Sequence, residues 1–538
     1  MEPHIDHLTP LTPLAFLARS ARVYGDRIAV RDGVFEVTYA ELAERARRLA
    51  GALRESGVEP GDRVAVLSPN SHVLLESHYG VPASGAALVA LNTRLAPAEI
   101  GDILDHSGAN VLIHDESLRG QAQDALGIAE GRIRGIEAGT ADSTYERILS
   151  AAAPVWAEPS SETAMLSINY TSGTTGAPKG VVYHHRGAYL QSLAMAFHSR
   201  LGLDSVYLWT LPMFHTNGWC FPWAVTAAGS VHRCLRRVDP EEIWRAIREE
   251  GVTHLCAAPT VLLMLADHPS AGEGSPQKIS VMTGGAPPTP ALLEQLARLN
   301  IEVVHLYGLT ETFGPAAICD WRPEWNELPA PEQARMKARQ GVENVISQPL
   351  RVVDAAGADV PLDGSTIGEI TITGNNLMAG YYLDEEATRR AIPDGWFRTG
   401  DLAVMHTDGY VEIVDRAKDI IISGGENISS LEVERVLARH PAVYEAAVVG
   451  VPDAKWGEAV TAVVELRPGA EVSESELIEY VKSQLARYKA PKRVAFEQLP
   501  RTSTGKIQKH RLRADLSGDS AISTSGPEGL DAPGVHWA

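Results

Sequence analysis

The sequence predicts an α/β fold with a large N-terminal domain and a small α+β domain near the C-terminus, and three observations support this. Over the first two-thirds of the chain, short apolar runs of strand length alternate with stretches of helix length, which is the pattern of parallel sheets built from βαβ units. From residue 350 to residue 415, apolar and polar residues alternate between Gly/Asp turns, which indicates an antiparallel sheet or small barrel. After Asp419, helix-capping motifs and further strands indicate a unit with its own core.

Short apolar runs mark the predicted strands of the first part, and helical patterns lie between several of them. The predicted strands cover residues 63–67, 110–114, 206–211, 254–257, 279–283 and 303–306. Predicted helices between them include residues 241–250 and 290–299.

The C-terminal part begins its helices with capping boxes. Ser429 and Ser473 are each followed three positions later by glutamate, and residues 444–449 and 459–466 are predicted strands. We therefore divide the chain into a large domain, a small domain and a tail whose Ser, Gly, Asp and Pro content predicts disorder. These three parts cover residues 1–417, 418–515 and 516–538.

Composition excludes several classes of partner. The 538 residues carry 48 Lys and Arg against 68 Asp and Glu, a net charge of −20, which argues against nucleic acids and anionic membranes. No run of eighteen apolar residues predicts a membrane-spanning helix, and neither a signal peptide nor a C-terminal peroxisomal tripeptide is expected. The cysteines fit no zinc spacing, and their low number favours a cytoplasmic protein. They are Cys220, Cys234, Cys256 and Cys319.

Residues 170–180 read Tyr-Thr-Ser-Gly-Thr-Thr-Gly-Ala-Pro-Lys-Gly and lie between the apolar runs 164–168 and 181–183. This context predicts a hairpin loop between two buried strands. Its glycines allow backbone N–H groups to point into one concave space, and hydroxyls and one ammonium add donors, so the loop suits a polyphosphate. A mobile linker is the alternative, but linkers seldom lie between two apolar β-runs. The expected phosphate ligands are Thr171, Ser172, Gly173, Thr174, Thr175, Gly176 and Lys179.

The loop closely resembles the phosphate-binding signature of the adenylate-forming superfamily, which includes acyl-CoA synthetases, luciferases and peptide-synthetase adenylation domains. The resemblance extends over residues 14–512 and includes four further signatures. It implies that ATP and CoA are co-substrates, with Mg²⁺ as cofactor, and that the small domain is mobile.

The second signature, residues 307–311, follows a predicted strand, where open parallel sheets bind ligands. By resemblance the ring of Tyr307 packs on adenine, Thr310 holds the α-phosphate and Glu311, with Thr171, binds Mg²⁺. Taken alone, these residues would fit a simple turn with a helix cap. The third signature, by the same resemblance, lines the adenine and one wall of the acyl pocket. Its residues are Gly284, Gly285, Ala286 and Pro287, and Gly284 and Gly308 are expected to leave the pocket floor open to an extended chain.

Two further signatures supply charged groups. Asp401 resembles the family's ribose-binding aspartate, and Arg416 resembles the arginine that reaches ribose and phosphate. Lys418 stands at the hinge position, where the small domain pivots. Lys506, in the segment 500–509, resembles the catalytic lysine that stabilises charge during adenylation.

Two segments concern the acyl group and CoA. His215 resembles a family residue at the carboxylate and thioester step, Asn217 is placed with it in the acyl pocket, and Trp219 resembles a tryptophan that gates the acyl tunnel. A core aromatic cluster is the alternative for this segment. The loop Ser423, Gly424 and Gly425 resembles the one that shapes the CoA tunnel.

The resemblance implies an ATP-dependent carboxylic acid–CoA ligase that forms an acyl-AMP and transfers the acyl group to CoA. A medium- to long-chain fatty acid is the expected substrate, and short, methylthio- or aryl-carboxylic acids are alternatives. An acyl-AMP ligase loading a carrier protein, a plain ATPase and a nucleotide-binding protein without catalysis are further alternatives. A homodimer is left open.

Overall fold

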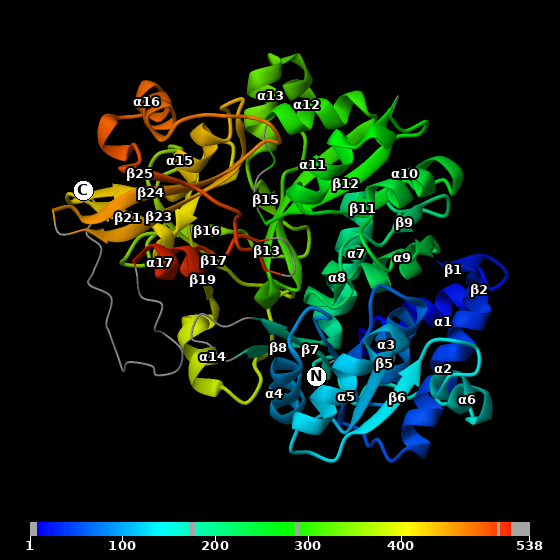
Figure 1. Cartoon of the computed structure of the whole chain (residues 1–538). Helices are drawn as coiled ribbons and strands as arrows, with labels where there is room; N and C mark the ends of the chain where they lie inside the picture. Colours follow the sequence, from blue (N-terminus) through cyan, green and yellow to red (C-terminus); the bar gives the residue numbers. More distant parts are fainter. Residues whose placement is uncertain are drawn as a thin grey trace, which may run out of the picture.

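The computed structural model describes most of the chain, and its larger part consists of sheets and helices in stacked layers (Figure 1). The described residues are 8–171, 178–272, 274–285, 288, 290–453, 455–502 and 506–517. Within them, every helix is too short or too polar to cross a bilayer.

The first sheet has nine strands among the described residues, and six neighbouring strands of it, from β13 to β1, run parallel. Its order, from edge to edge, is β15 (Val342–Glu343), β14 (Gly314–Ile318), β13 (Ile301–Leu309), β12 (Ile279–Gly284), β11 (His254–Cys256), β9 (Val206–Leu208), β10 (Val231–Arg233), β1 (Ile28–Asp32) and β2 (Phe35–Thr38).

The second sheet has seven strands, of which β7, β4, β3, β5 and β6 run parallel. Its order is β18 (Gly380–Tyr381), β8 (Lys179–His184), β7 (Met165–Thr171), β4 (Ala87–Ala90), β3 (Arg63–Leu67), β5 (Val111–Asp115) and β6 (Arg134–Ala138). The antiparallel pair β7–β8 confirms the predicted hairpin, and the residues between Thr171 and Pro178 lie outside the described residues.

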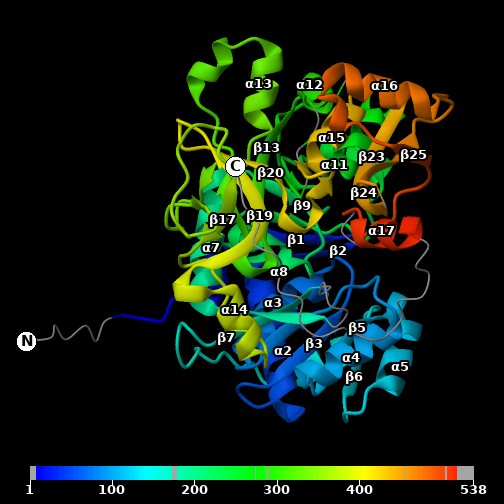
Figure 2. The same ribbon diagram turned by 90° about the vertical axis from the view of Figure 1, so that its left-hand side faces the viewer.

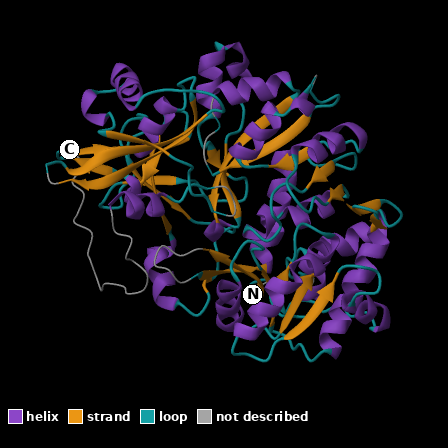
Figure 3. Ribbon diagram, in the orientation of Figure 1, coloured by secondary structure: helices purple, strands orange, loops and turns teal. Residues whose placement is uncertain are grey.

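Helices fill the space between the two sheets and cover their outer faces, as Figures 2 and 3 show. The inner layer is formed by α1 (Leu14–Val23), α3 (His72–Ala83), α7 (His185–Ser199), α8 (Thr216–Trp219) and α9 (Phe221–Ala228). The outer helices of the first sheet are α10 (Pro240–Glu249), α11 (Pro259–Asp267) and α12 (Pro290–Arg298), and those of the second are α4 (Pro97–Ser107) and α5 (Arg119–Ile128). The remaining helices of this part are α2 (Tyr39–Glu55), α6 (Thr144–Ala151), α13 (Ala330–Lys337) and α14 (Glu385–Ala391).

Local sequence signals fix the helix starts. Thr38 accepts a hydrogen bond from the N–H of Glu41 in a complete capping box that opens α2. Asp239 caps α10, and Pro240 follows at the first helical position, where its missing N–H costs nothing. The apolar side chains of α10 then face the first sheet, so the helix packs by its buried stripe.

Two smaller sheets, antiparallel except for one strand pair, complete the fold, and the second of them lies at the upper left in Figure 1. The first, as predicted, has the order β16 (Arg351–Val353), β17 (Gly368–Ile372), β19 (Phe397–Met405) and β20 (Val411–Arg416). The second consists of β22 (Glu426–Ile428), β21 (Ile421–Ser423), β24 (Gly457–Leu466) and β23 (Val443–Asp453), with β25 (Arg493–Phe496) parallel to β24. Its helices are α15 (Ser430–Leu437), α16 (Glu474–Gln484) and α17 (Lys509–Ser517).

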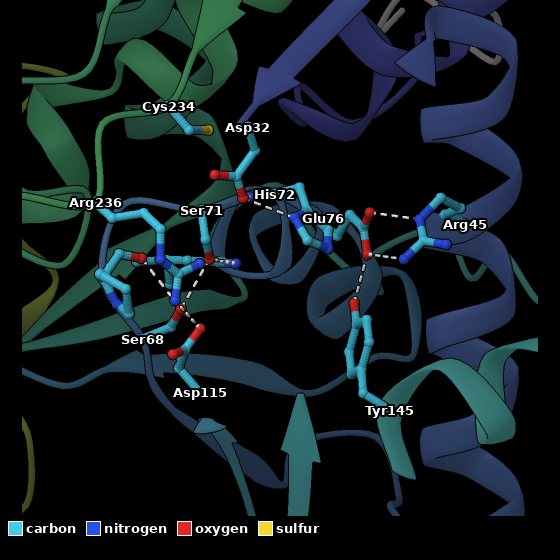
Figure 4. A network of polar contacts seen from close by, with 12 residues as sticks. Asp32, Arg45, Ser68, Ser71, His72, Glu76, Asp115, Tyr145, Cys234 and Arg236 are labelled. Carbon is cyan, nitrogen blue, oxygen red and sulfur yellow. Dashed lines mark hydrogen bonds and ion pairs between the residues drawn. The ribbon is translucent and has the colours of Figure 1, made fainter. Parts of the chain in front are cut away.

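Polar contacts link the two large sheets and the helices beside them, as Figure 4 shows. Asp115, at the end of β5, pairs with Arg236, which follows β10 in the other sheet, at 2.6 Å. Glu76 of α3 is fully buried and accepts from both Arg45 and Tyr145, each at 2.6 Å. Because a buried carboxylate is stable only when its oxygens are paired, Asp115 ties β5 to the segment after β10, and Glu76 ties α3 to α2 and α6.

Most predicted elements agree with the structure, and three differ from it. The strand expected at 206–211 ends at Leu208, because the chain turns there into the loop that carries His215. The strand expected at 303–306 extends over Ile301–Leu309, paired on both sides by β12 and β14. The predicted disordered tail begins too early, since residues 516 and 517 belong to α17 and Leu516 packs on the C-terminal core.

Candidate active site

The candidate site lies where the β7–β8 hairpin meets the end of β13. The hydroxyl of Tyr183 on β8 donates to the carbonyl oxygen of Thr310, which directly follows β13, at 2.7 Å. Tyr381 donates to Glu311 Oε1 at 2.8 Å, and the ammonium of Lys179 lies 5.0 Å from the centroid of the Tyr381 ring. The structure therefore brings Lys179, Thr310 and Glu311 together beside the mouth of the predicted phosphate loop.

Asp401 and Arg416 form a second group, on β19 and β20. The buried Asp401 carboxylate accepts from the Tyr307 hydroxyl at 2.7 Å and pairs with Arg416 Nε at 3.1 Å. Burial and the neighbouring Asp401 charge raise the pKa of Tyr307, so its hydroxyl stays protonated and keeps donating. Tyr307 is thereby fixed by its hydroxyl.

Lys506 reaches this group from the C-terminal part of the chain. Burial among protein atoms, together with the charges of Arg416 and Lys418 and against the opposing charge of Asp401, lowers the pKa of Lys506 to about 8. Lys506 is nevertheless exposed to solvent and does not lie in a core. An exposed ammonium beside Asp401 and Arg416 is available to a negatively charged ligand.

His215 lies close enough to Lys506 to feel its charge. Burial lowers the pKa of His215 to about 4, and the charge of Lys506 adds to this effect, so the imidazole is neutral at neutral pH. Ser423, Gly424 and Gly425 lie elsewhere, at the β21–β22 turn, which Figure 1 shows well away from the β7–β8 hairpin. The structure thus combines Lys506, and not the Ser423–Gly425 turn, with the Asp401 group.

Five consecutive residues after His215 form a left-handed turn that the sequence did not reveal. Their φ angles are 52° at Thr216, 37° at Asn217, 53° at Gly218, 55° at Trp219 and 64° at Cys220. Left-handed backbone costs residues with a Cβ about 1–2 kcal/mol each, so surrounding contacts must hold this turn. An Asn-Gly pair in a sequence predicts one or two left-handed residues, but no turn motif predicts five in succession.

The turn places the Trp219 indole across the expected acyl pocket. A Cβ on Gly284 would lie 3.3 Å from the Trp219 ring, and one on Gly314 would lie 3.1 Å from it. The expectation that Gly284 and Gly308 leave the pocket floor open is therefore wrong. The ring covers Gly284, and the Gly314 carbonyl oxygen lies 2.0 Å from where a Gly308 Cβ would stand.

Asn217 was expected in the acyl pocket, but its side chain is fully buried and points away from it. Its Oδ1 accepts from Ser167 at 2.5 Å and from Asn169 at 2.7 Å, and its Nδ2 lies 3.1 Å from His78 Nε2. The left-handed φ at Asn217 turns the side chain inward, so it cannot make these buried hydrogen bonds and also face the acyl pocket. Asn217 supports the pocket from behind.

Asn70 also supports the His215 loop, and sequence reasoning missed it. Its amide donates to the carbonyl oxygens of Trp209 and Leu211 at 2.8 and 3.0 Å, and its Oδ1 accepts from the N–H of Met213 at 2.7 Å. No local motif marks Asn70, since its partners are about 140 positions away. Tyr183 and Tyr381 were missed for the same reason.

Several expected site residues receive no structural account. Ser172, Gly173, Thr174, Thr175 and Gly176 lie outside the described residues, as do Ala286 and Pro287. Thr171 ends β7, and Gly285 is exposed with a φ of 98°.

The donors present fit a magnesium ion that is bound chiefly through a nucleotide. Among the described residues, no three His, Cys, Asp or Glu side chains gather as a metal site of their own. Mg²⁺ commonly uses one or two carboxylates together with substrate phosphates and water. Glu311 near Lys179 provides one such carboxylate, while Tyr381 holds it in place.

Comparison with known proteins identifies relatives along nearly the whole chain. The profile of the family described as AMP-binding enzyme matches residues 17–382, and that of the AMP-binding enzyme C-terminal domain matches residues 432–506. The chain is 43% identical to acetate–CoA ligase CCL3 of Humulus lupulus over 96% of both chains. It is 42% identical to 4-hydroxybutyrate–CoA ligase 2 of Metallosphaera sedula over 94% of both.

Solved structures of similar fold include ATP-bound MatB from Rhodopseudomonas palustris, with a TM-score of 0.82 and 28% identity over 94% of this chain and 99% of that one. The Mycobacterium tuberculosis fatty acyl CoA synthetase has a TM-score of 0.72 and 34% identity over the same shares.

Proposed function

The chain belongs to the AMP-binding enzyme family and is an AMP-forming acyl-CoA synthetase, and we propose that its acid is a short-chain carboxylate such as acetate, propionate or butyrate. One observation carries this proposal: the Trp219 indole lies 3.3 and 3.1 Å from where Cβ atoms on Gly284 and Gly314 would stand. We infer that the ring occupies the space that a longer chain would need. Because protein interiors are closely packed, an additional methylene there meets a ring.

The named activities of relatives agree with this choice. Relatives at 43%, 43% and 41% identity are named as acetate, 2-methylpropanoate and acetate/butyrate CoA ligases. The sequence-based preference for a medium- or long-chain acid came from the residues around His215, which resemble those of fatty acyl-CoA synthetases, and from an expected open pocket floor. The Trp219 ring lies against Gly284 in that floor. A short acid was one of the alternatives, and it is now the favoured one.

In the first step we assign the nucleotide to the group around Glu311 and Asp401. Lys179 and the hydroxyl loop would hold the leaving phosphates, Thr310 the α-phosphate, and Glu311 with Thr171 would hold Mg²⁺. Mg²⁺ supplies charge neutralisation on the phosphates when bound. Asp401 and Arg416 are already paired at 3.1 Å, and the Asp401 carboxylate would accept hydrogen bonds from the ribose hydroxyls.

Lys506 would stabilise the negative charge that spreads over the acid and the α-phosphate as the acyl-AMP forms. His215, neutral because burial lowers its pKa to about 4, would lie beside the carboxylate without a competing charge. In the second step the residues after Lys418 would rotate and bring Ser423, Gly424 and Gly425 to the site for CoA. Lys506 would be needed in the first step and the Ser423–Gly425 turn in the second, so a rotation that exchanges them would serve both steps.

Two further assignments remain proposals. CoA is the proposed acceptor, as in the named relatives, and a carrier protein is the alternative. We propose a cytoplasmic location because all four cysteines are free and buried, although several relatives are named as peroxisomal.

The test measures pyrophosphate release and CoA-dependent thioester formation with straight-chain acids from acetate to octanoate. The wild-type protein should use two- to four-carbon acids and discriminate against hexanoate. Trp219→Gly, which suits the φ of 55°, should raise kcat/KM for hexanoate about tenfold or more, since a pocket discriminates one methylene by about 10–200-fold. Trp156→Ala, which removes a tryptophan stacked with Arg47, is the matched control and should leave the profile unchanged. A wild-type preference for octanoate would refute the proposal.

A further inference from the structure

Two asparagines, Asn169 and Asn217, are hydrogen-bonded to each other at the left-handed turn Thr216–Cys220. Asn169 on β7 accepts the backbone N–H of Asn217 on its Oδ1 at 2.9 Å and donates from its Nδ2 to Asn217 Oδ1 at 2.7 Å. Ser167, also on β7, donates to the same Asn217 oxygen at 2.5 Å. All three side chains are buried, so each of these bonds is shielded from competing water.

His78 completes the network and fixes the direction of every bond. Its Nδ1 lies 2.7 Å from the carbonyl oxygen of Leu74, which can only accept, so Nδ1 carries the proton. Its Nε2 is then an acceptor and takes the Nδ2 hydrogen of Asn217 at 3.1 Å. Burial lowers the pKa of His78 to about 4, so the neutral imidazole that this bond requires persists at neutral pH.

The network acts at a strained place. Asn217 has a φ of 37°, and Trp219, two residues later, has a φ of 55°. The Asn217 main chain is held through its N–H and its side chain through both amide atoms. The neighbouring residue makes a longer contact, since Thr216 Oγ1 lies 3.3 Å from Thr310 Oγ1.

We propose that Asn169 and Asn217 are positioning residues that fix the Trp219 indole over Gly284 and Gly314 and thereby set the longest acid that the enzyme accepts. The inference rests on the proposed function, since it concerns the same acyl pocket. The two asparagines touch no substrate, so they act only through Trp219. Because Asn169 lies two residues before Thr171, the same strand that enters the phosphate loop also holds the wall of the acyl pocket.

Two variants remove the network in different ways. Asn169→Ala removes the bonds to the Asn217 main chain and side chain but changes no strained residue. Asn217→Gly removes the side chain while suiting the left-handed backbone, so it spares the turn the cost of a Cβ. Asn110→Ala, at a half-buried asparagine whose amide bonds Asp62, is the matched control for loss of an asparagine hydrogen bond.

The experiment measures kcat/KM for straight-chain acids from acetate to octanoate with wild type, the three variants, Trp219→Gly and the double variant Asn169→Ala/Trp219→Gly. The readout is a ratio of two kcat/KM values. The numerator is kcat/KM for the acid two methylenes longer than the preferred acid, and the denominator is kcat/KM for the preferred acid. Asn169→Ala and Asn217→Gly should each raise this ratio about tenfold, and Asn110→Ala should leave it unchanged. In the Trp219→Gly background, Asn169→Ala should change the ratio by less than about twofold, because the ring through which it acts is gone.

An equal loss of kcat/KM for all acids, with the ratio unchanged in both variants, would show a merely structural role and overturn the proposal. A shift of the same size with and without Trp219 would overturn it as well. The ratio is defined from the preferred acid, whatever its length, so a long-chain wild-type preference would refute the proposed function while leaving this test valid. A short-chain preference with an unchanged ratio would refute only the role of the asparagines.

Discussion

The pKa of Lys506 predicts how the first half-reaction depends on pH. Burial and the charges of Arg416 and Lys418 bring this pKa to about 8, below the ordinary 10.5. The folded protein therefore loses the Lys506 proton at lower pH than the unfolded chain does. In the free enzyme the ammonium is about 90% protonated at pH 7 and about 10% at pH 9.

If only the ammonium supports adenylation, kcat/KM for ATP should fall about tenfold from pH 7 to pH 9. Bound phosphates favour the charged form, so kcat should fall at higher pH than kcat/KM does. Lys506→Ala should lower adenylation about 10²–10³-fold, the usual effect of removing one donor to a developing anion. Lys506→Arg, which stays charged, should retain a reduced activity without the alkaline decline.

The assay follows acid-dependent pyrophosphate release from pH 6.5 to pH 10, together with thioester formation from preformed acyl-AMP and CoA. The second reaction does not use Lys506 in our assignment, so it should keep its rate in Lys506→Ala. An alkaline decline centred near 10.5, or equal losses of Lys506→Ala in both half-reactions, would refute the reasoning.

Two other predictions concern Tyr381 and acid stability. Tyr381→Phe removes the hydrogen bond that holds Glu311. It should raise the Mg²⁺ concentration needed for half-maximal activity several-fold, with little change in the free energy of unfolding. An unchanged Mg²⁺ dependence would exclude this role of Tyr381. Burial lowers the pKa values of His78, His185, His215 and His305 to about 4 and that of His232 to about 3, so the unfolded state binds more protons between pH 6.5 and pH 4. Stability from these groups is complete above pH 6.5 and is lost as pH falls, by about 6 kcal/mol per unit near pH 5, which urea midpoints at pH 7, 6 and 5.5 would measure. His305→Gln should reduce this slope by about one-fifth, and an unchanged slope would contradict the assignment.

Much of the architecture could be predicted from periodicity and turn residues. Alternating apolar runs located the parallel strands, and the apolar residues on both sides of the glycine-rich segment predicted the β7–β8 hairpin. Ser429 and Ser473 cap α15 and α16 as expected, each accepting an N–H three residues later. These features are local, because a strand or a cap depends on residues a few positions apart.

The site was predicted in part. Lys179 and Glu311, and separately Asp401 and Arg416, lie together as the motifs implied, whereas their roles in binding ATP stay predictions. The supporting residues Tyr381 and Asn70 carry no motif, because each acts through one hydrogen bond or a few to partners distant in sequence. Side-chain direction also escaped prediction, as Asn217 faces inward and Trp219 covers Gly284.

The sequence by itself determined the sheets, the β7–β8 hairpin and the class of chemistry, since these follow from short-range patterns. Only the tertiary structure decided the shape of the acyl pocket. The left-handed turn at Thr216–Cys220 is unfavourable in isolation and is held by Asn169 and His78, which lie 48 and 139 positions from Asn217. A conformation that local preferences oppose exists only where distant groups hold it, so the position of Trp219 becomes visible only in the folded chain.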